Sequence, residues 1–133
     1  MIGLDTSVVV RYLVRRPESQ AVAAAAVVDG PDELGMSVVV LLETAHVLRT
    51  QYGVSRGDVL SALIELLTRE DVRVLGLSKE HALEALVRAR SLPGTPIADA
   101  LVVAMAREAE AIPLYAFDQG IARHGVDVRV PGR

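Results

Sequence analysis

Four acidic residues lie inside strongly apolar stretches of the chain, and this placement limits the folds that the sequence can adopt. They are Asp5 in MIGLDTSVVV, Glu43 in VVVLLETAHVL, Asp99 in PIADALVVAMA and Asp118 in PLYAFDQGIA. Burying an ionised carboxylate is costly unless a cation compensates it. No lysine or arginine lies within these stretches. The sequence therefore predicts that the four acids meet in the fold and hold a divalent cation such as Mg²⁺ or Mn²⁺, which prefers oxygen ligands.

Two other acids, Glu65 and Glu84, also stand among leucines, but each is followed four residues later by an arginine, Arg69 or Arg88. An acid that precedes a base by four residues is a favourable pair on a helix surface. We therefore expect these two acids to be solvated. Glu43 has only valines at the corresponding positions, so it is either a metal ligand or a buried acid that is hydrogen-bonded within the protein.

Short apolar segments alternate with segments of helical periodicity along the chain. This alternation predicts one α/β sandwich domain, residues 1–133, with a mainly parallel sheet. Strands are expected at 1–4, 33–37, 72–76 and 113–117, with an edge strand at 126–130. Helices are expected at 6–14, 19–29, 38–52 and 96–111, and two further helices are expected to begin after 55 and after 78.

Residues with short polar side chains stand where the expected helices begin. Thr6 or Ser7 can cap the first helix, Ser37 the third and Ser78 the fifth, while Ser55 opens the fourth with the spacing of a capping box. For Thr6 and Ser7 a second role is open, because either hydroxyl can also bind a ligand carboxylate or a substrate phosphate.

The expected elements place the four acids where a site can form. Functional sites of parallel α/β sheets lie beyond the carboxyl ends of the strands. Asp5 and Asp118 directly follow expected strands, and Asp99 falls in the first turn of a helix. Glu43 lies about two turns into another helix. We therefore expect four separate segments to bring the acids to one edge of the sheet.

Composition narrows the class of protein. The chain has no cysteine, which excludes disulfides and cysteine-rich zinc sites, and it has no apolar run of membrane-spanning length. The first ten residues are interrupted by Asp5 and lack a basic leader, so we expect a cytoplasmic protein without a signal peptide. The net charge is −3, but without the four acids the remaining residues sum to +1. Arg11, Arg15 and Arg16 form either a solvated helix end or a phosphate-binding patch.

The ordered set of motifs resembles a PIN domain, in particular a VapC-type toxin of a toxin–antitoxin pair. The motifs are D-T-S at Asp5, L-L-E-T-A-H-V-L at Glu43, I-A-D-A-L-V-V-A-M-A at Asp99 and A-F-D at Asp118. The resemblance implies a three-layer α/β/α sandwich and an Mg²⁺- or Mn²⁺-dependent endoribonuclease that uses these four acids. Asp118 then either binds the metal or orients a water molecule. Ala116 departs from the threonine that many relatives carry before Phe-Asp.

The resemblance also implies partners, namely an RNA substrate, a second copy of the chain and a small cognate antitoxin. The third helix, Val38 to Tyr52, and the fifth, Ala82 to Arg90, carry more apolar surface than one buried face needs, which favours a homodimer. The second helix, Gln20 to Val28, is rich in alanine and valine. This helix either packs on the sheet or forms, with the first helix, a groove for an antitoxin segment that inserts an arginine among the acids.

Other functions fit the sequence less well. A phosphatase of the haloacid-dehalogenase type needs a second acid two residues after the first, where Ser7 stands, and it needs a lysine near the phosphate, whereas the only lysine is Lys79. The three histidines are too scattered for zinc and are expected at the surface: His46, His81 and His124. A non-catalytic RNA- or protein-binding module with the same fold remains the alternative.

Only four aromatic residues are available to stack on unpaired RNA bases: Tyr12, Tyr52, Tyr115 and Phe117. Of these, Tyr115 and Phe117 are expected in the core of a strand. The RNA target is left open by the sequence.

Overall fold

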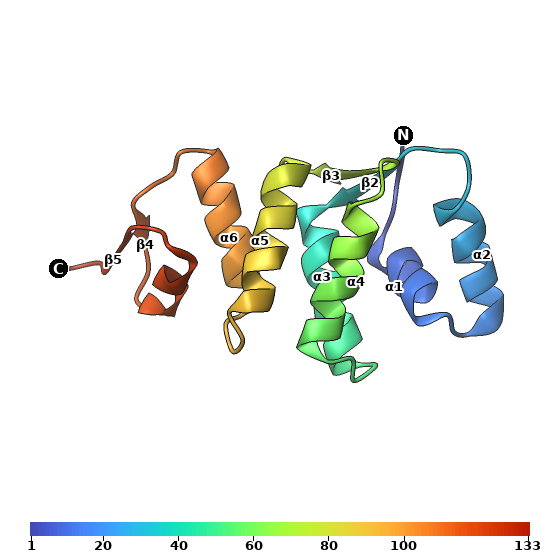
Figure 1. Ribbon diagram of the computed structural model, residues 1–133, viewed down its shortest axis with the longest axis horizontal. Helices are drawn as coiled ribbons and strands as arrows, with labels where there is room; N and C mark the ends of the chain where they lie inside the picture. The colour runs from blue at the N-terminus through green and yellow to red at the C-terminus, as the bar shows by residue number, and fades with distance from the viewer. The chain divides into compact units, whose positions relative to one another are not determined.

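The computed structural model describes residues 1–133 as two compact units, an N-terminal unit (Met1–Gly76) and a C-terminal unit (Leu77–Arg133). Each unit combines helices with parallel strands (Figure 1). Parallel strands require crossover connections, and helices fill most of these connections here. The predicted α/β class with parallel pairing is therefore confirmed. None of the helices combines the length and apolarity that crossing a membrane requires.

The N-terminal unit is a three-stranded parallel sheet with four helices. The strand order is β1-β2-β3, and Leu34 of the central strand lies opposite Ile2 on one side and Val72 on the other. Leu34 and Met36 are fully buried, as expected for a central parallel strand. In chain order the elements are β1 (Ile2–Gly3), α1 (Thr6–Val14), α2 (Glu18–Val28), β2 (Leu34–Ser37), α3 (Val38–Thr50), α4 (Arg56–Leu67) and β3 (Val72–Leu75).

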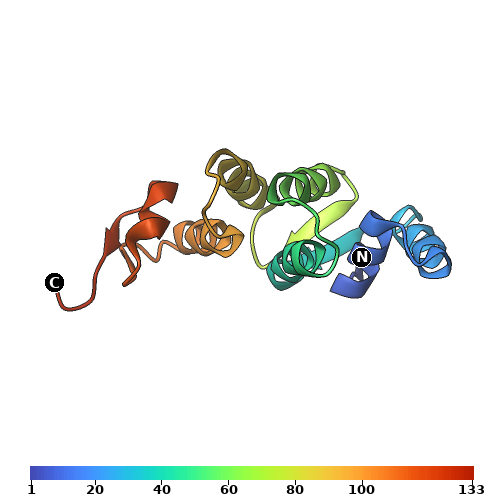
Figure 2. The same cartoon turned by 90° about the horizontal axis from the view of Figure 1, so that it is seen from below.

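The C-terminal unit contains a helix pair and a small parallel ribbon. Its elements are α5 (Lys79–Ser91), α6 (Ile97–Glu108), β4 (Leu114–Tyr115), the 3₁₀ helix η1 (Gln119–His124) and β5 (Val128–Arg129). The helices α5 and α6 lie side by side (Figures 1 and 2). Buried alanines on both helices allow this close approach: Ala82, Ala85, Ala89, Ala100 and Ala104. A second apolar cluster joins α6 to the segment around η1 and consists of Val103, Ile121 and Val126.

Serine caps begin three of the helices as predicted. The side chains of Ser37, Ser55 and Ser78 each accept a hydrogen bond from the backbone N–H three residues later. The first helix differs, because Asp5 is its N-cap and accepts from the N–H of Ser7. The predicted cap at Thr6 or Ser7 is therefore wrong. Aspartate caps as well as serine does, and the cap at Asp5 leaves both hydroxyls inside the helix for other partners.

The helix α2 ends within one residue of the predicted boundary, just before Gly30-Pro31. The helix ends at Val28, and a Cβ added to Gly30 would approach the carbonyl oxygen of Ala26 to 2.8 Å. Real Cβ atoms do not come so close to a backbone oxygen, so glycine allows the chain to turn tightly toward β2 here.

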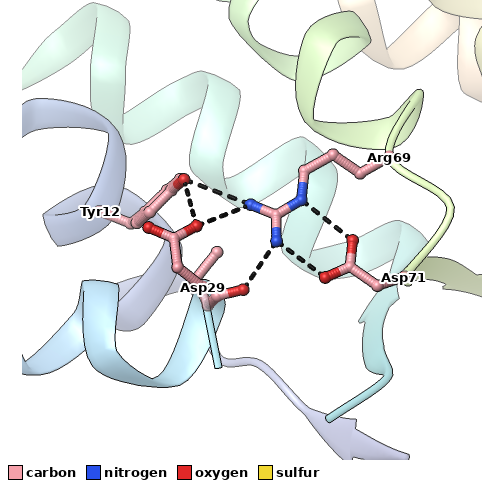
Figure 3. A network of polar contacts seen from close by, with 5 residues as sticks. Tyr12, Asp29, Arg69 and Asp71 are labelled. Atoms are coloured by element: carbon pink, nitrogen blue, oxygen red, sulfur yellow. Dashed lines mark hydrogen bonds and ion pairs between the residues drawn. The ribbon is translucent and has the colours of Figure 1, made fainter. Parts of the chain in front are cut away.

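Arg69 ties three parts of the N-terminal unit together (Figure 3). Its Nε and Nη2 donate to the two carboxylate oxygens of Asp71, at 3.0 and 2.8 Å. Its Nη1 donates to Asp29 Oδ1 and to the hydroxyl of Tyr12, and Nη2 also reaches the carbonyl of Val28. These bonds connect α1, the end of α2 and the segment before β3, so Arg69 fixes how α1 and α2 meet the sheet.

The two helical ion pairs expected from the sequence have different outcomes. Arg88 Nη2 lies 2.9 Å from Glu84 Oε1, which confirms the pair on α5. Arg69 lies beyond the end of α4 at Leu67, so helical spacing does not govern its contacts. It binds Asp29 and Asp71 outside the helix.

We expect Arg69→Ala to lower the free energy of unfolding by about 1–3 kcal/mol, because it removes a bidentate charged contact and leaves the Val28 carbonyl and the Tyr12 hydroxyl without this donor. Arg73→Ala is the matched control, since it breaks the more exposed ion pair with Glu33 and is expected to cost roughly 0–1 kcal/mol. Urea denaturation followed by circular dichroism measures both. Equal losses in the two variants would contradict a structural role for the Arg69 network.

Candidate functional site

Asp5 stands at the end of β1 and begins α1 with an exposed carboxylate. Its Oδ2 accepts two hydrogen bonds from Ser7, one from the backbone N–H at 3.3 Å and one from the hydroxyl at 2.9 Å. The hydroxyl of Ser7, with the backbone N–H groups of Ser7 and Thr6, lowers the pKa of Asp5 below its ordinary value. Asp5 is therefore charged at neutral pH, and neither bond from Ser7 engages its Oδ1.

Thr6 links the start of α1 to Glu43 in the middle of α3. Its side chain is buried, and its hydroxyl donates a hydrogen bond to Glu43 Oε1. The helices α1 and α3 pack against each other, which brings this pair together. Since Thr6 directly follows Asp5, this bond ties Glu43 of α3 to the residue next to Asp5 in the chain.

The pair of Asp5 and Glu43 fits a hard divalent cation. Mg²⁺ is commonly bound by one or two carboxylates together with water and substrate phosphates. Both side chains supply oxygen ligands, both are exposed to solvent, and each is oriented by a neighbouring hydroxyl. Neither unit by itself brings three acidic or histidine side chains into one cluster. The local arrangement thus supplies part of a ligand set of the expected chemistry.

In the C-terminal unit the two predicted acids stand on α6 and η1, which pack against each other. Asp99 lies in the first turn of α6 and is half-buried. Asp118 is the N-cap of η1, is exposed, and accepts from the N–H of Gly120 at 2.8 Å through Oδ1. A carboxylate is favoured at the start of a helix because the backbone N–H groups there point toward it.

The four acids were expected to be buried. This prediction is wrong for three of them, and the fourth, Asp99, is only half-buried. Asp5, Glu43 and Asp118 are exposed. The apolar neighbours misled the prediction because several of them are exposed too. On α3, Val39 beside Glu43 is 74 % exposed. The chain can therefore fold without a cation that compensates these acids. A metal is favoured only because their carboxylates supply oxygen ligands.

Tyr115 and Phe117 are likewise not the core residues that the sequence suggested. Tyr115 in β4 is 60 % exposed, and Phe117, which directly precedes Asp118, is 80 % exposed. The strand β4 has two residues and pairs only with β5, so one face of this ribbon has no covering layer within its own unit. Leu114 and Ala116 on the other face pack on the cluster around Val103.

His124, expected at the surface, is 1 % exposed and is the residue that sequence reasoning most clearly missed. Its two ring nitrogens have no hydrogen-bond partner within the protein, and its ring borders a cavity of about 20 Å³, room for one water molecule. The spacing of His124 from Ile121 could have predicted this burial. Residues three apart share a face in a 3₁₀ helix, and Ile121 is buried as well.

Two arginines hold the end of η1 beside this histidine. Arg88 Nη1 and Arg107 Nη2 both donate to the carbonyl oxygen of His124, at 3.0 and 3.1 Å, and Arg107 also reaches the carbonyl of Gly125 at 2.8 Å. Burial lowers the pKa of His124, and these arginines and Arg123 lower it further, against the opposing effect of Asp99. The ring is thus neutral at neutral pH and packs as an uncharged group.

Comparison with known proteins identifies one family. The model of the PIN domain matches residues 2–126, which include all four predicted acids and run through both units. PIN domains are generally nucleases and typically bind a divalent metal. The α/β class, the parallel strands and the helices agree with this family and are consistent with a three-layer sandwich. No curated protein and no solved structure shows significant similarity to the chain.

The buried position of His124 predicts a pH-dependent stability. The unfolded chain takes up a proton on this histidine near the ordinary value of about 6.5, whereas the folded chain does so only at lower pH. The unfolded state therefore binds more protons as pH falls below that value, so stability should decline between about pH 7 and pH 5.5. We expect His124→Gln to flatten this decline in melting temperature. His46→Gln, at an exposed position, is the control and should keep it. Identical pH profiles for wild type and His124→Gln would contradict the assignment.

Proposed function

Because this chain belongs to the PIN-domain family, we propose that it is an Mg²⁺- or Mn²⁺-dependent endoribonuclease and, more narrowly, a VapC-type toxin. The observation that carries the proposal is the arrangement at the start of α1, where the hydroxyl of buried Thr6, the residue next to Asp5 in the chain, donates to Glu43. We further propose that residues 1–133 act as one nuclease domain, since the family match runs from one unit into the other.

In the proposed site, Asp5, Glu43 and Asp99 are metal ligands. Asp118 either completes the ligand set or orients the attacking water. When bound, the metal supplies Lewis-acid stabilisation of the charge that develops on the phosphodiester. The cap geometry supports a role for Asp118, because the bond from Gly120 ends on Oδ1 and holds the carboxylate at the start of η1.

Thr6 and Ser7 are proposed to position the ligands. The hydroxyl of Thr6 fixes one oxygen of Glu43, and Ser7 fixes Oδ2 of Asp5 with two donors. Such supporting hydrogen bonds orient metal ligands and usually matter for affinity. Ser7 also lowers the pKa of Asp5, which keeps this ligand charged when protons compete with the metal.

A small antitoxin is proposed as a protein partner, and the surface between α1 and α2 supports it. These two helices pack side by side (Figures 1 and 2) and leave an apolar hollow of about 310 Å³. The hollow begins at Ser7, next to Asp5, so a segment lying in it could extend an arginine toward the acids. It is lined by Ser7, Val8, Arg11, Gln20, Ala23, Ala24 and Val27.

Homodimerisation is proposed as well, because apolar side chains remain uncovered on the two helices that the sequence singled out. On α3, Val39 is 74 % and Leu42 37 % exposed, and on α5, Val87 is 45 % exposed. Each unit thus leaves apolar groups uncovered, and exposed apolar patches are typical of protein interfaces.

We expect Asp5→Asn and Asp99→Asn each to reduce metal-dependent RNA cleavage by at least about 100-fold, since even residues that merely support metal ligands cost roughly 10–100-fold when they are replaced. The fold should survive, because at position 5 asparagine caps a helix as well as aspartate does and keeps an acceptor for Ser7. At position 99 asparagine keeps the size and shape of the side chain. Cleavage of total RNA in Mn²⁺, with folding checked by circular dichroism, measures the effect.

The control is Asp32→Asn, which removes the same charge from an exposed acid outside the helices. It should cleave like the wild type. A folded Asp5→Asn protein with near-wild-type cleavage would leave the chain as a non-catalytic PIN-fold binding module.

Metal binding should also be visible without a substrate. A ligand that binds only the folded state at about tenfold above its Kd stabilises that state by roughly 1.4 kcal/mol, which for a chain of this size raises the melting temperature by roughly 3–5 °C. We expect Mg²⁺ or Mn²⁺ to produce this increase at neutral pH and to lose the effect in acid, where protonated carboxylates bind metal poorly. EDTA and the Asp5→Asn protein serve as controls. A melting temperature that does not respond to either metal would contradict a preformed site.

A further inference from the structure

The C-terminal end of α1 carries three arginines that make no ion pair. Arg11, Arg15 and Arg16 contact neutral groups, whereas Arg69 and Arg73 of the same unit pair with carboxylates. Arg15 and Arg16 are exposed. A surface cation that is not neutralised by the protein attracts an anionic ligand.

Two tyrosines hold these arginines in place. The guanidinium of Arg15 lies 4.8 Å from the ring centre of Tyr12, and that of Arg16 lies 5.4 Å from the ring centre of Tyr52. Arg11 Nη1 donates to the hydroxyl of Tyr52 at 2.9 Å. Cation–π stacking restricts the long side chains before any ligand arrives, which lowers the entropic cost of binding.

Tyr12 is itself fixed, because its hydroxyl donates to Asp29 and accepts from Arg69 (Figure 3). We refer to the five residues of this surface as the arginine–tyrosine patch: Arg11, Tyr12, Arg15, Arg16 and Tyr52.

Each stacked pair borders its own hollow. Tyr12 and Arg15 line a hollow of about 240 Å³, and Tyr52 and Arg16 line one of about 320 Å³. Leu13 lines both hollows, so they are neighbours on the surface. The surface therefore repeats one motif twice, a planar cation on an aromatic ring beside a recess with an apolar wall.

We propose that the arginine–tyrosine patch binds a single-stranded segment of the RNA, with the arginines on phosphates and two unstacked bases in the hollows. The inference rests on the proposed ribonuclease function. A nucleotide offers an anion and a flat π-surface together, and the repeated motif offers a partner for each. The planar guanidinium matches phosphate with two parallel donors. An acidic peptide would satisfy the cations but would leave the stacking surfaces without a matching group.

The patch is separate from the proposed metal ligands. Asp5 caps the N-terminal end of α1, and Arg15 is its C-cap. A helix of nine residues is roughly 14 Å long. A strand of RNA that contacts both ends of α1 therefore extends over several nucleotides, and the patch holds bases away from the bond to be cut.

The test is binding of a fluorescent single-stranded RNA of about 12 nucleotides to the full chain in EDTA, measured by anisotropy across a range of salt. We expect Arg15→Ala/Arg16→Ala to weaken binding about tenfold at low salt. The slope of log affinity against log salt should fall by about 1.4, since each phosphate contact on a single strand contributes about 0.7. Circular dichroism checks that the variant is folded.

Two comparisons sharpen the result. Arg73→Ala/Arg129→Ala removes the same charge from exposed arginines outside the patch and should change affinity less than about twofold. Glu65→Gln should strengthen binding, because Glu65 is the one acid that lines the hollow beside Arg15. Equal affinity of the Arg15→Ala/Arg16→Ala variant and wild type, or no RNA binding by wild type, would overturn the proposal.

The same measurements separate the patch from the nuclease. A wild type that binds RNA through Arg15 and Arg16 but shows no cleavage in Mn²⁺ would refute the proposed activity and leave the patch standing. Cleavage by the wild type together with unchanged RNA affinity of the double variant would refute the patch and leave the proposed activity standing.

A labelled poly-glutamate peptide of the same length tests the other possible ligand of this surface. If it binds as tightly as RNA and depends equally on both arginines, the surface is a site for an acidic protein segment.

Discussion

The guanidinium of Arg69 is the contact on which the N-terminal unit most depends. It joins Tyr12 of α1, Asp29 and the carbonyl of Val28 at the end of α2, and Asp71 just before β3. Tyr12, Val28 and Asp29 lie 40 or more residues away from Arg69 in the sequence. The network fixes α1, and α1 carries both the cap at Asp5 and the arginines at its other end. Arg69 thus helps to fix the cap at Asp5, which it does not contact, and the arginines at the other end of α1, whose neighbour Tyr12 it binds directly.

The candidate ligands illustrate how one carboxylate can serve structure and chemistry together. Asp5 and Asp118 are both N-caps, and each uses one carboxylate oxygen to accept a backbone N–H at the start of its helix. The N–H groups at a helix start stabilise the ionised form of an acid. That stabilisation also keeps the acid ready for a cation, because protons and metal compete for the same oxygens. Capping and metal binding therefore favour the same charge state, and a neutral asparagine can satisfy only the first.

Much of the fold could be predicted from the sequence, because local signals determined it. The serines at Ser37, Ser55 and Ser78 cap helices where expected, and the alternation of elements gives parallel strands. Burial could not be predicted in the same way. An apolar run shows which residues prefer to be covered, but Val39 and Phe117 remain exposed within their units, and the acids beside them are exposed too.

Polar contacts between segments that are distant in the sequence could not be predicted either. Arg69 meets Asp29 across 40 residues, and Thr6 meets Glu43 across 37. Periodicity and helical spacing describe neighbours within one element, so neither pair leaves a signature. His124 was missed for a related reason, since its burial follows from the 3₁₀ helix over Gln119–His124, a segment that the sequence predicted as a short turn or helix.

The charges on α1 follow one rule, and this rule accounts for its two proposed surfaces. The N-terminal end of a helix favours a negative group and the C-terminal end a positive one. Asp5 stands at the first end, and Arg11 and Arg15 stand at the second. The arrangement that stabilises the helix is therefore also the one that the two proposals require, with the cation at the acidic end and the phosphates at the arginine end. The proposed ribonuclease would use both, one end to act on the phosphodiester and the other to hold the strand, and a single short helix fixed by Arg69 presents the two ends at a set separation.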